Sequence, residues 1–197
     1  CANRIYVQAG VYDVFAEKLA AKVGELTTGN GFDEGVFFGP LINDGAVRKV
    51  QAHIADAQSK GALVTLGGQP HAMGGTFFEP TIITGVTSDM AVATEETFGP
   101  LAPLFKFETE AEVVQAANDT DFGLASYFYS SNHARVWRVS EALEYGMVGV
   151  NTGLISTAEA PFGGIKQSGL GREGARQGLD DFLETKYICM GGIDAEG

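Results

Sequence analysis

Short apolar runs alternate with longer segments of helical periodicity along most of the chain, and this alternation constrains the fold more than any other feature. In residues 14–27 and 44–60, apolar side chains recur every three or four residues, as on one face of an amphipathic helix. Runs rich in branched residues, such as 63–66 and 81–83, predict strands. Because strands that alternate with helices form βαβ units, we predict an α/β fold: a mostly parallel sheet with helices on both faces.

The other predicted elements continue this pattern to the end of the chain. Asn43 or Asp44 caps the helix at 44–60, and Gly61 follows its last turn. The segments 87–103 and 151–175 are the least like simple connections, and ligands of such sheets bind on loops. Further strands are predicted at 3–8, 104–107, 124–129, 147–150 and 187–190, and further helices at 108–117, 133–143 and around Leu179.

The charge balance and the distribution of apolar residues limit the partners of this chain. Its 197 residues include 13 Lys and Arg against 25 Asp and Glu, which gives a formal net charge of −12. Binding to nucleic acid without sequence preference, or to anionic membranes, requires clustered basic residues. No apolar run approaches the roughly 20 residues that span a bilayer. We therefore expect no nucleic-acid partner and no membrane association.

Cysteines and histidines favour neither a disulfide scaffold nor a metal centre. The two cysteines, Cys1 and Cys189, are too few for a disulfide framework. The chain start shows no signal-peptide pattern, so a cytoplasmic location is expected. The three histidines, at positions 53, 71 and 133, lack the spacing of metal ligands, so no metal site is expected.

Two loop segments carry candidate chemistry. In Glu95–Pro100, two adjacent carboxylates precede an aromatic residue and a Gly-Pro turn, which favours one glutamate facing a cleft while the other stays solvated. The alternative is an acidic turn with Phe98 in the core. In Pro161–Gly169, an aromatic beside paired glycines allows close approach of the backbone to a neighbour or a ligand, or forms only a packed loop. The G-x-G-x-x-G segment 169–174 lacks the strand of a dinucleotide fingerprint, and we interpret it as a turn before a helix.

Four separated segments of the chain follow one another in a distinctive order. They are Glu-Glu-Thr-Phe-Gly-Pro at 95–100, Asn-Asp-Thr-Asp-Phe-Gly-Leu at 118–124, Val-Asn at 150–151 and Pro-Phe-Gly-Gly-x-Lys-x-Ser-Gly at 161–169. In this order and spacing they resemble the aldehyde dehydrogenase family, and the resemblance covers residues 1 to about 190. The opening Cys-Ala-Asn-Arg and the stretch 149–156 are similar to the succinate-semialdehyde dehydrogenase branch, and glutarate-semialdehyde dehydrogenases share both features.

Enzymes of this family attack an aldehyde with a cysteine thiolate, pass a hydride to NAD or NADP and release the acid by hydrolysis of a thioester. The resemblance aligns Cys1 with the second cysteine of a Cys-x-Cys pair, which puts the nucleophile two residues before Cys1, outside this chain. The general-base glutamate and the Rossmann cofactor domain also belong upstream. The resemblance thus implies a fragment that is inactive alone. Residues 1–170 would be the catalytic domain, incomplete at its start, and residues 171–197 a C-terminal return segment with an oligomerisation strand.

The same resemblance implies roles for residues within the chain. Glu96 matches the glutamate that hydrogen-bonds the ribose hydroxyls of the nicotinamide cofactor, and Phe98 matches the aromatic residue beside the nicotinamide. Ser156 matches the serine that binds the distal carboxylate of the substrate, and Phe162 matches the aromatic residue near the substrate tunnel. Cys1 is either a small buried hydrophobic residue or a redox partner that forms a disulfide with the nucleophile under oxidation.

The remaining expectations concern assembly and substrate. Residues 183–190 match the segment that adds to the sheet of a neighbouring subunit, so a homo-oligomer, either a dimer or a tetramer, is expected. The implied function is the NAD(P)-dependent oxidation of succinate semialdehyde. The alternatives are another aldehyde dehydrogenase, such as a glutarate-semialdehyde dehydrogenase, and a catalytically dead interaction domain. The choice between NAD and NADP stays open, because it depends on the cofactor domain.

Overall fold

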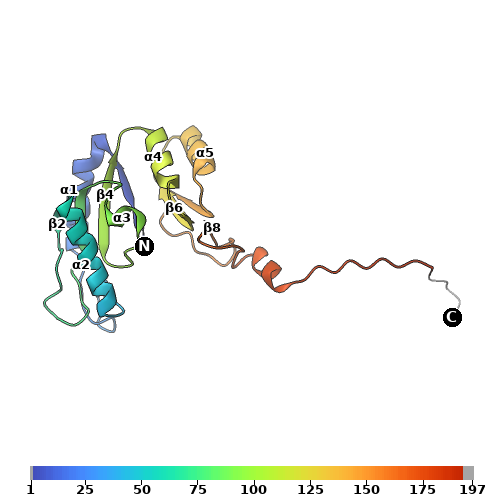
Figure 1. Ribbon diagram of the computed structural model, residues 1–197, viewed down its shortest axis with the longest axis horizontal. Coiled ribbons are helices and arrows are strands. Elements are labelled where there is room, and N and C mark those ends of the chain that lie inside the picture. Colours follow the sequence, from blue (N-terminus) through green and yellow to red (C-terminus); the bar gives the residue numbers. More distant parts are fainter. Residues whose placement is uncertain (1, 193–197) are drawn as a thin grey trace. The chain divides into compact units, whose positions relative to one another are not determined.

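The computed structural model of the protein describes residues 2–192, and its chain divides into two compact units, Cys1–Ala116 and Ala117–Gly197. Figure 1 labels helices and strands of both units. The division is one of compactness, and the domain boundary expected at residue 170 stays a prediction. Cys1, with its expected redox role, lies outside the described residues.

The first unit is built on a four-stranded sheet with the strand order β1-β4-β3-β2. β4 pairs in parallel with both β1 and β3, whereas β2 pairs antiparallel with β3. The predicted α/β class is confirmed, but the sheet is mixed and only partly parallel. The strands are β1 (Ile5–Gln8), β2 (Leu63–Leu66), β3 (Thr81–Val86) and β4 (Leu101–Phe107).

The antiparallel edge follows from the connection between β2 and β3. Residues 67–80 contain no helix, and a parallel pair needs a long crossover connection that is usually helical. Gly67 and Gly68 turn the chain with φ values of +66° and +97°. A Cβ atom on Gly67 would lie 2.3 Å from the carbonyl oxygen of Pro80, so the backbones approach closely there. The chain therefore returns beside the strand that it has just left.

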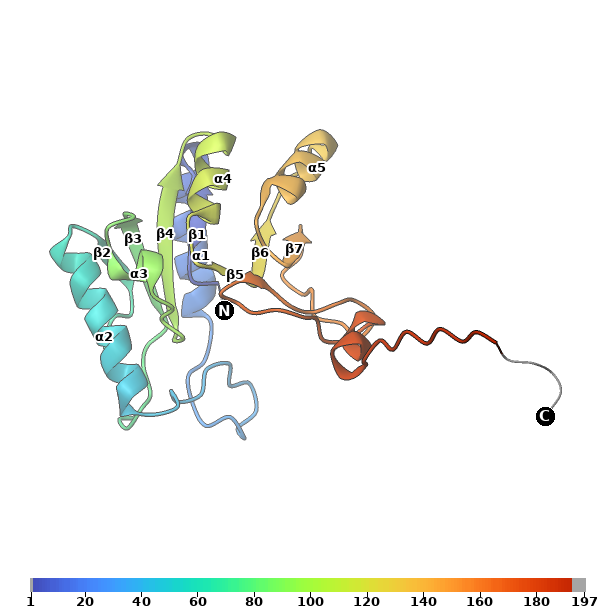
Figure 2. The same ribbon diagram turned by 45° about the vertical axis from the view of Figure 1, so that its right-hand side comes forward.

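Two helices cover opposite faces of this sheet, as the sequence predicted. They are α1 (Tyr12–Gly24), preceded by the short 3₁₀ helix η1 (Ala9–Val11), and α2 (Asp44–Ser59), and the sheet lies between them in Figure 2. Adjacent residues of β3 show the division, since Ile82 packs in the α1 cluster and Ile83 in the α2 cluster. The side chains that α1 and α2 contribute to these clusters are Tyr12, Ala16, Leu19, Ala20 and Val23 from α1, and Val47, Val50, Ile54 and Ala57 from α2.

Local sequence sets both ends of α2. The Asn43 side chain accepts a hydrogen bond from the backbone N–H of Ala46 at 3.0 Å, so Asn43 rather than Asp44 is the N-cap. Gly61, with φ of +97°, follows the helix in the left-handed conformation that glycine adopts at low cost. The predicted boundaries of this helix are confirmed within a residue or two.

The second unit contains a βαβ arrangement and a two-stranded ribbon. β6 (Ala125–Phe128) and β7 (Met147–Val150) pair in parallel, and α5 (His133–Ala142) connects them. β5 (Phe122–Gly123) pairs antiparallel with β8 (Ile165–Lys166). The division between the units falls within α4 (Glu110–Asn118).

Glycines bring two backbone segments of the second unit into direct contact. A Cβ atom on Gly146 would lie 2.0 Å from the carbonyl oxygen of Gly163 and 2.8 Å from the Cα atom of Gly164. The paired glycines of the segment 161–169 therefore serve close approach to a neighbouring loop, which is one of the two interpretations of this motif.

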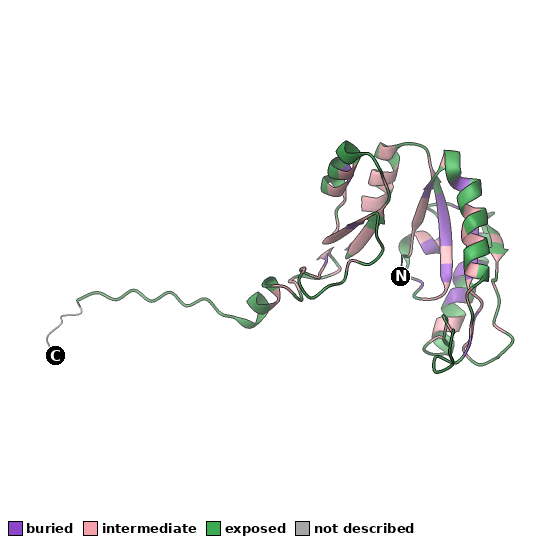
Figure 3. Ribbon diagram, turned by 180° about the vertical axis from the view of Figure 1, so that it is seen from behind, coloured by how far each residue is buried: buried purple, intermediate pink, exposed green. Residues whose placement is uncertain are grey.

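Between β8 and residue 192, the structure contains one helical element, the 3₁₀ helix η2 (Gln177–Phe182), near the helix predicted around Leu179. Residues 183–192 form neither helix nor strand, and they are exposed, as the green colour of this segment in Figure 3 shows. The strand predicted at 187–190 is not formed, because no segment within residues 2–192 supplies it with a ladder partner. Among the same residues, no helix has the length and apolar character needed to cross a bilayer.

Candidate functional site

The loop Glu95–Pro100 connects α3 (Ala91–Thr94) to β4 and turns its central residues alternately outward and inward. Thr97 is buried, with 5% of its surface exposed, whereas Glu96 and Phe98 on either side of it are exposed. Phe98 is 72% exposed, so the alternative of an acidic turn with Phe98 in the core is wrong. The loop therefore presents a carboxylate and an aromatic ring to solvent from positions that flank a buried residue.

A buried histidine of α2 anchors this loop. The Nδ1 atom of His53 lies 2.9 Å from the Thr97 hydroxyl, and its Nε2 atom lies 3.2 Å from a carboxylate oxygen of Glu95. Because an ionised carboxylate only accepts hydrogen bonds, Nε2 carries the proton that is donated to Glu95. In the neutral ring, Nδ1 then accepts from the Thr97 hydroxyl. Both ring nitrogens of a residue with 3% of its surface exposed are thus satisfied by one loop.

The backbone at Phe98 is held in a conformation that aromatic residues rarely adopt. Its φ is +50°, in the left-handed region, which costs on the order of 1–3 kcal/mol for a residue with a Cβ atom. Such a conformation persists only where the flanking structure determines it. On one side Thr97 is fixed by His53, and on the other a Cβ atom on Gly99 would lie 2.6 Å from Val50 of α2.

The approach to the loop is fixed through α3. A carboxylate oxygen of Asp56 in α2 accepts a hydrogen bond from the backbone N–H of Ala91, the first residue of α3, at 2.7 Å. The pKa of Asp56 lies below its ordinary value, first because Lys60 donates to this carboxylate and second because Ala91 does. The ionised side chain of Asp56 therefore holds α3 on α2.

A second candidate loop, residues 151–161, follows β7 in the second unit. Asn151 fixes its start, because its side chain accepts from the backbone N–H of Ser130 at 2.9 Å and donates to the carbonyl oxygen of Ser130 at 2.9 Å. Beyond that point Ser156 is exposed and Leu154 is 93% exposed, and near the end of the loop the carbonyl oxygen of Ala158 accepts a hydrogen bond from the backbone N–H of Ala175 at 2.8 Å. Ser156 therefore lies on a surface loop that is fixed at its base.

Phe162 lies where this loop becomes a paired segment. Its backbone N–H donates to Glu173 at 2.8 Å, and its carbonyl oxygen accepts from the N–H of Glu173 at 2.7 Å. The side chain of Arg172 donates to the carbonyl oxygen of Gly164 at 2.8 Å. Phe162 is half-buried, so part of its surface stays accessible. In the segment 169–174, all three motif glycines have positive φ and precede η2, in agreement with a turn.

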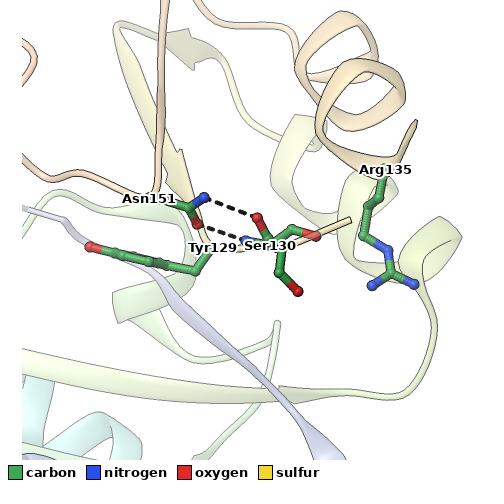
Figure 4. A pocket seen from close by; sticks show the side chains of 5 residues that line it. Tyr129, Ser130, Arg135 and Asn151 are labelled. Carbon is green, nitrogen blue, oxygen red and sulfur yellow. Dashed lines mark hydrogen bonds between the residues drawn. The ribbon is translucent and has the colours of Figure 1, made fainter. Parts of the chain in front are cut away.

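An open hollow of about 580 Å³ lies at the start of α5 (Figure 4). Asn151 and Ser130 hydrogen-bond each other at its base, as the dashed lines in Figure 4 show. None of the residues expected to bind cofactor or substrate lines this hollow. Its lining residues are Tyr129, Ser130, Ser131, Arg135 and Asn151. In the described part of the chain, no group of three or more His, Cys, Asp and Glu residues is arranged to hold a metal ion.

The structure thus places the expected binding residues in two groups. Glu96 and Phe98 share one loop of the first unit, and Ser156 and Phe162 lie within and just after one loop of the second. Sequence reasoning missed His53 as part of the first group, because histidines were weighed only as metal ligands. Its place in the apolar stripe of α2 was the signal that could have identified a buried, hydrogen-bonded imidazole.

Comparison with known proteins places the chain in a family. Residues 1–188 match the family described as the aldehyde dehydrogenase family. The chain belongs to the aldehyde dehydrogenase family. The resemblance of the four separated segments to this family is therefore confirmed.

Several curated members of the family are close in sequence. The chain is 65% identical to 3-sulfolactaldehyde dehydrogenase of Pseudomonas putida, covering 98% of this chain and 40% of the relative. It is 64% identical to glutarate-semialdehyde dehydrogenase of Pseudomonas aeruginosa, with the same coverage. It is 61% identical to the NADP(+) succinate-semialdehyde dehydrogenase of Escherichia coli, covering 97% of this chain and 40% of the relative. The chain therefore spans about 40% of the length of these relatives.

Solved structures of the family share the fold of this chain. The crystal structure of succinate-semialdehyde dehydrogenase from Burkholderia pseudomallei matches with a TM-score of 0.95 at 62% identity. The match covers 96% of this chain and 39% of that one. The two units of this chain therefore have the backbone course of the corresponding part of an aldehyde dehydrogenase.

Proposed function

We propose that this chain is part of an NAD(P)-dependent semialdehyde dehydrogenase, of the branch that oxidises succinate semialdehyde to the acid through a cysteine thioester. The observation that carries the proposal is the anchored loop Glu95–Pro100, which presents Glu96 and Phe98 to solvent. The names of the relatives support the same reaction class. We further propose that the nucleophile belongs to the longer protein, two residues before the position of Cys1, and that the 197-residue chain alone is inactive; its span of about 40% of the relatives' length supports this.

The exposed groups of this loop fit a nicotinamide dinucleotide. When bound, NAD or NADP accepts the hydride that leaves the aldehyde carbon. The carboxylate of Glu96 has two oxygens that accept hydrogen bonds from the ribose hydroxyls. The ring of Phe98 offers a flat apolar surface against which another flat ring packs. The positive φ of Phe98, held from both sides, keeps that ring accessible instead of folded into the core.

The second loop is proposed to bind the substrate. The three related enzymes are named for substrates that share one chemical feature, an anionic group remote from the aldehyde. The exposed hydroxyl of Ser156 is suited to donate a hydrogen bond to such a group, and the half-buried ring of Phe162 is suited to line the path to the aldehyde. Succinate semialdehyde is the proposed substrate, and glutarate semialdehyde is the alternative.

Two further roles belong to the longer protein. Cys1 is proposed to form a reversible disulfide with the nucleophile under oxidation, which makes it a redox residue and not a catalytic one. Residues 183–190 are proposed to add to the sheet of a neighbouring subunit in a dimer or tetramer. Their exposed apolar side chains support this assignment, among them Tyr187, Ile188 and Met190. We propose a cytoplasmic location for the assembled enzyme.

The test uses the full-length protein that contains this chain, assayed for aldehyde-dependent reduction of NAD and of NADP. In the variant Glu96→Gln, hydride transfer in a single turnover should slow by about tenfold or more, because the loss of a hydrogen bond to a charged group costs roughly 1.5–3 kcal/mol. Glu17→Gln, which neutralises an exposed carboxylate of α1, is the matched control and should keep the wild-type rate. An unchanged rate in Glu96→Gln would contradict the cofactor role, and a full-length protein without turnover would favour the inactive interaction domain.

A further inference from the structure

We propose that His53 is a positioning residue for the reaction: it holds Thr97 from inside the core and thereby directs Glu96 and Phe98 to the cofactor. This inference rests on the proposed function, which assigns Glu96 and Phe98 to the nicotinamide. His53 itself touches neither cofactor nor substrate. It acts through the loop Glu95–Pro100.

The first support is where the polar contacts of His53 go. On α2 it lies in the apolar stripe beside Val50 and Ile54, where an aliphatic residue would serve packing alone. Burying an imidazole is unfavourable unless its nitrogens find partners. Both partners, Thr97 and Glu95, belong to the candidate loop. The polar residue at this place in the stripe is thus explained by the loop that it holds.

The second support is the alternation of residues 96 to 98. Thr97 points inward to His53, so its two neighbours must turn outward, and both are exposed. Without the contact at Thr97, the left-handed backbone at Phe98 would lose its adjacent fixed point on the amino side and keep the one at Gly99. The strain at Phe98 would then relax by moving the ring. A displacement of about 1 Å in a positioning group is enough to slow a reaction about 100-fold.

The experiment compares four variants of the full-length protein. His53→Leu removes both hydrogen bonds but keeps apolar bulk, and Thr97→Val removes the hydroxyl at nearly constant shape. The double variant His53→Leu/Thr97→Val tests whether the two residues act as one unit. His53→Asn restores a hydrogen-bonding atom near the place of Nδ1. Each is measured for the single-turnover hydride-transfer rate per active site, for the KM of the aldehyde and for the thermal midpoint.

The proposal predicts that His53→Leu and Thr97→Val each slow hydride transfer about tenfold, that the double variant is no slower than the worse single one, and that His53→Asn recovers most of the rate. The KM of the aldehyde should stay within about twofold, since the substrate loop is untouched. A lower thermal midpoint with an unchanged rate per active site would overturn the proposal and leave His53 a structural residue. Thr97→Val alone decides the matter if His53→Leu does not fold.

The variant Glu96→Gln separates this inference from the proposed function. If Glu96→Gln slows hydride transfer while Thr97→Val and His53→Leu do not, only the positioning role of His53 fails. If Glu96→Gln is without effect, the assignment of the loop to the cofactor fails, and the positioning role fails with it.

Discussion

The two candidate loops differ in how the chain holds them. The loop Glu95–Pro100 is fixed along its length by α2, through His53 on one side of Phe98 and through Val50 against Gly99 on the other. The loop 151–161 is fixed at its base by Asn151 and near its end by a backbone hydrogen bond from Ala175 to Ala158, and most side chains between these points are exposed. One loop is built into the core, whereas the other rests on the surface of its unit.

This difference matches the roles proposed for the loops. A nicotinamide cofactor is common to the reaction class, so the residues that orient it gain from a rigid frame. The relatives are named for different aldehydes at similar identity to this chain. A substrate loop whose central side chains are largely exposed tolerates the changes that select one aldehyde over another. We infer that the anchored loop Glu95–Pro100 is rigid because it orients the cofactor, and that the loop 151–161 is more exposed because it binds the substrate.

The largest difference in stability is expected between two variants that each add one methyl group, one in each loop. In Gly99→Ala the new Cβ atom would meet the buried Val50 at 2.6 Å, and overpacking of this kind costs about 1–3 kcal/mol. In Gly153→Ala nothing lies within 4 Å of the new atom, and a change below about 0.5 kcal/mol is expected. Urea unfolding of the full-length protein measures both. Equal shifts of the midpoint would remove the distinction between an anchored and an open loop.

A smaller change in the free energy of unfolding is expected when the backbone strain at Phe98 is relieved. In Phe98→Asn, a residue that tolerates positive φ replaces one that does not, so the free energy of unfolding should rise by about 1 kcal/mol while hydride transfer slows. The backbone of Asn151 has a similar φ of +56°, and asparagine tolerates this conformation. Asn151→Ala should therefore destabilise the protein, since it also removes two hydrogen bonds to Ser130. If Phe98→Asn lowers stability instead, the left-handed backbone there is not strained.

The sequence predicted the elements well where local patterns decide them. The apolar stripe of α2 and the cap at Asn43 are local features, and both are confirmed. The antiparallel pairing of β2 depends on a long-range contact that the spacing of apolar residues does not encode. The strand predicted at 187–190 is not formed, because strand-favouring residue types need a ladder partner and none lies within residues 2–192.

The sequence indicated only part of the candidate site, because its motif is local whereas its anchor depends on a long-range contact. Glu96 and Phe98 were identified from the motif that contains them, and their exposure agrees with a binding role. The anchor was not identified, because His53 lies 44 residues before Thr97 in the sequence. Only the packing of α2 against the loop brings the two together. The motif selects the candidate residues, and the fold shows which residues hold them in place.

The most direct test of the division between the loops uses Ser156→Ala in the full-length protein with two substrates. One is succinate semialdehyde, and the other is an uncharged aldehyde of the same length. Loss of a hydrogen bond to a carboxylate should raise the KM of succinate semialdehyde about tenfold. The KM of the uncharged aldehyde, and the hydride-transfer rate with either substrate, should change less than about twofold. An equal rise in KM for both aldehydes would contradict the assignment of the open loop to the acidic end of the substrate.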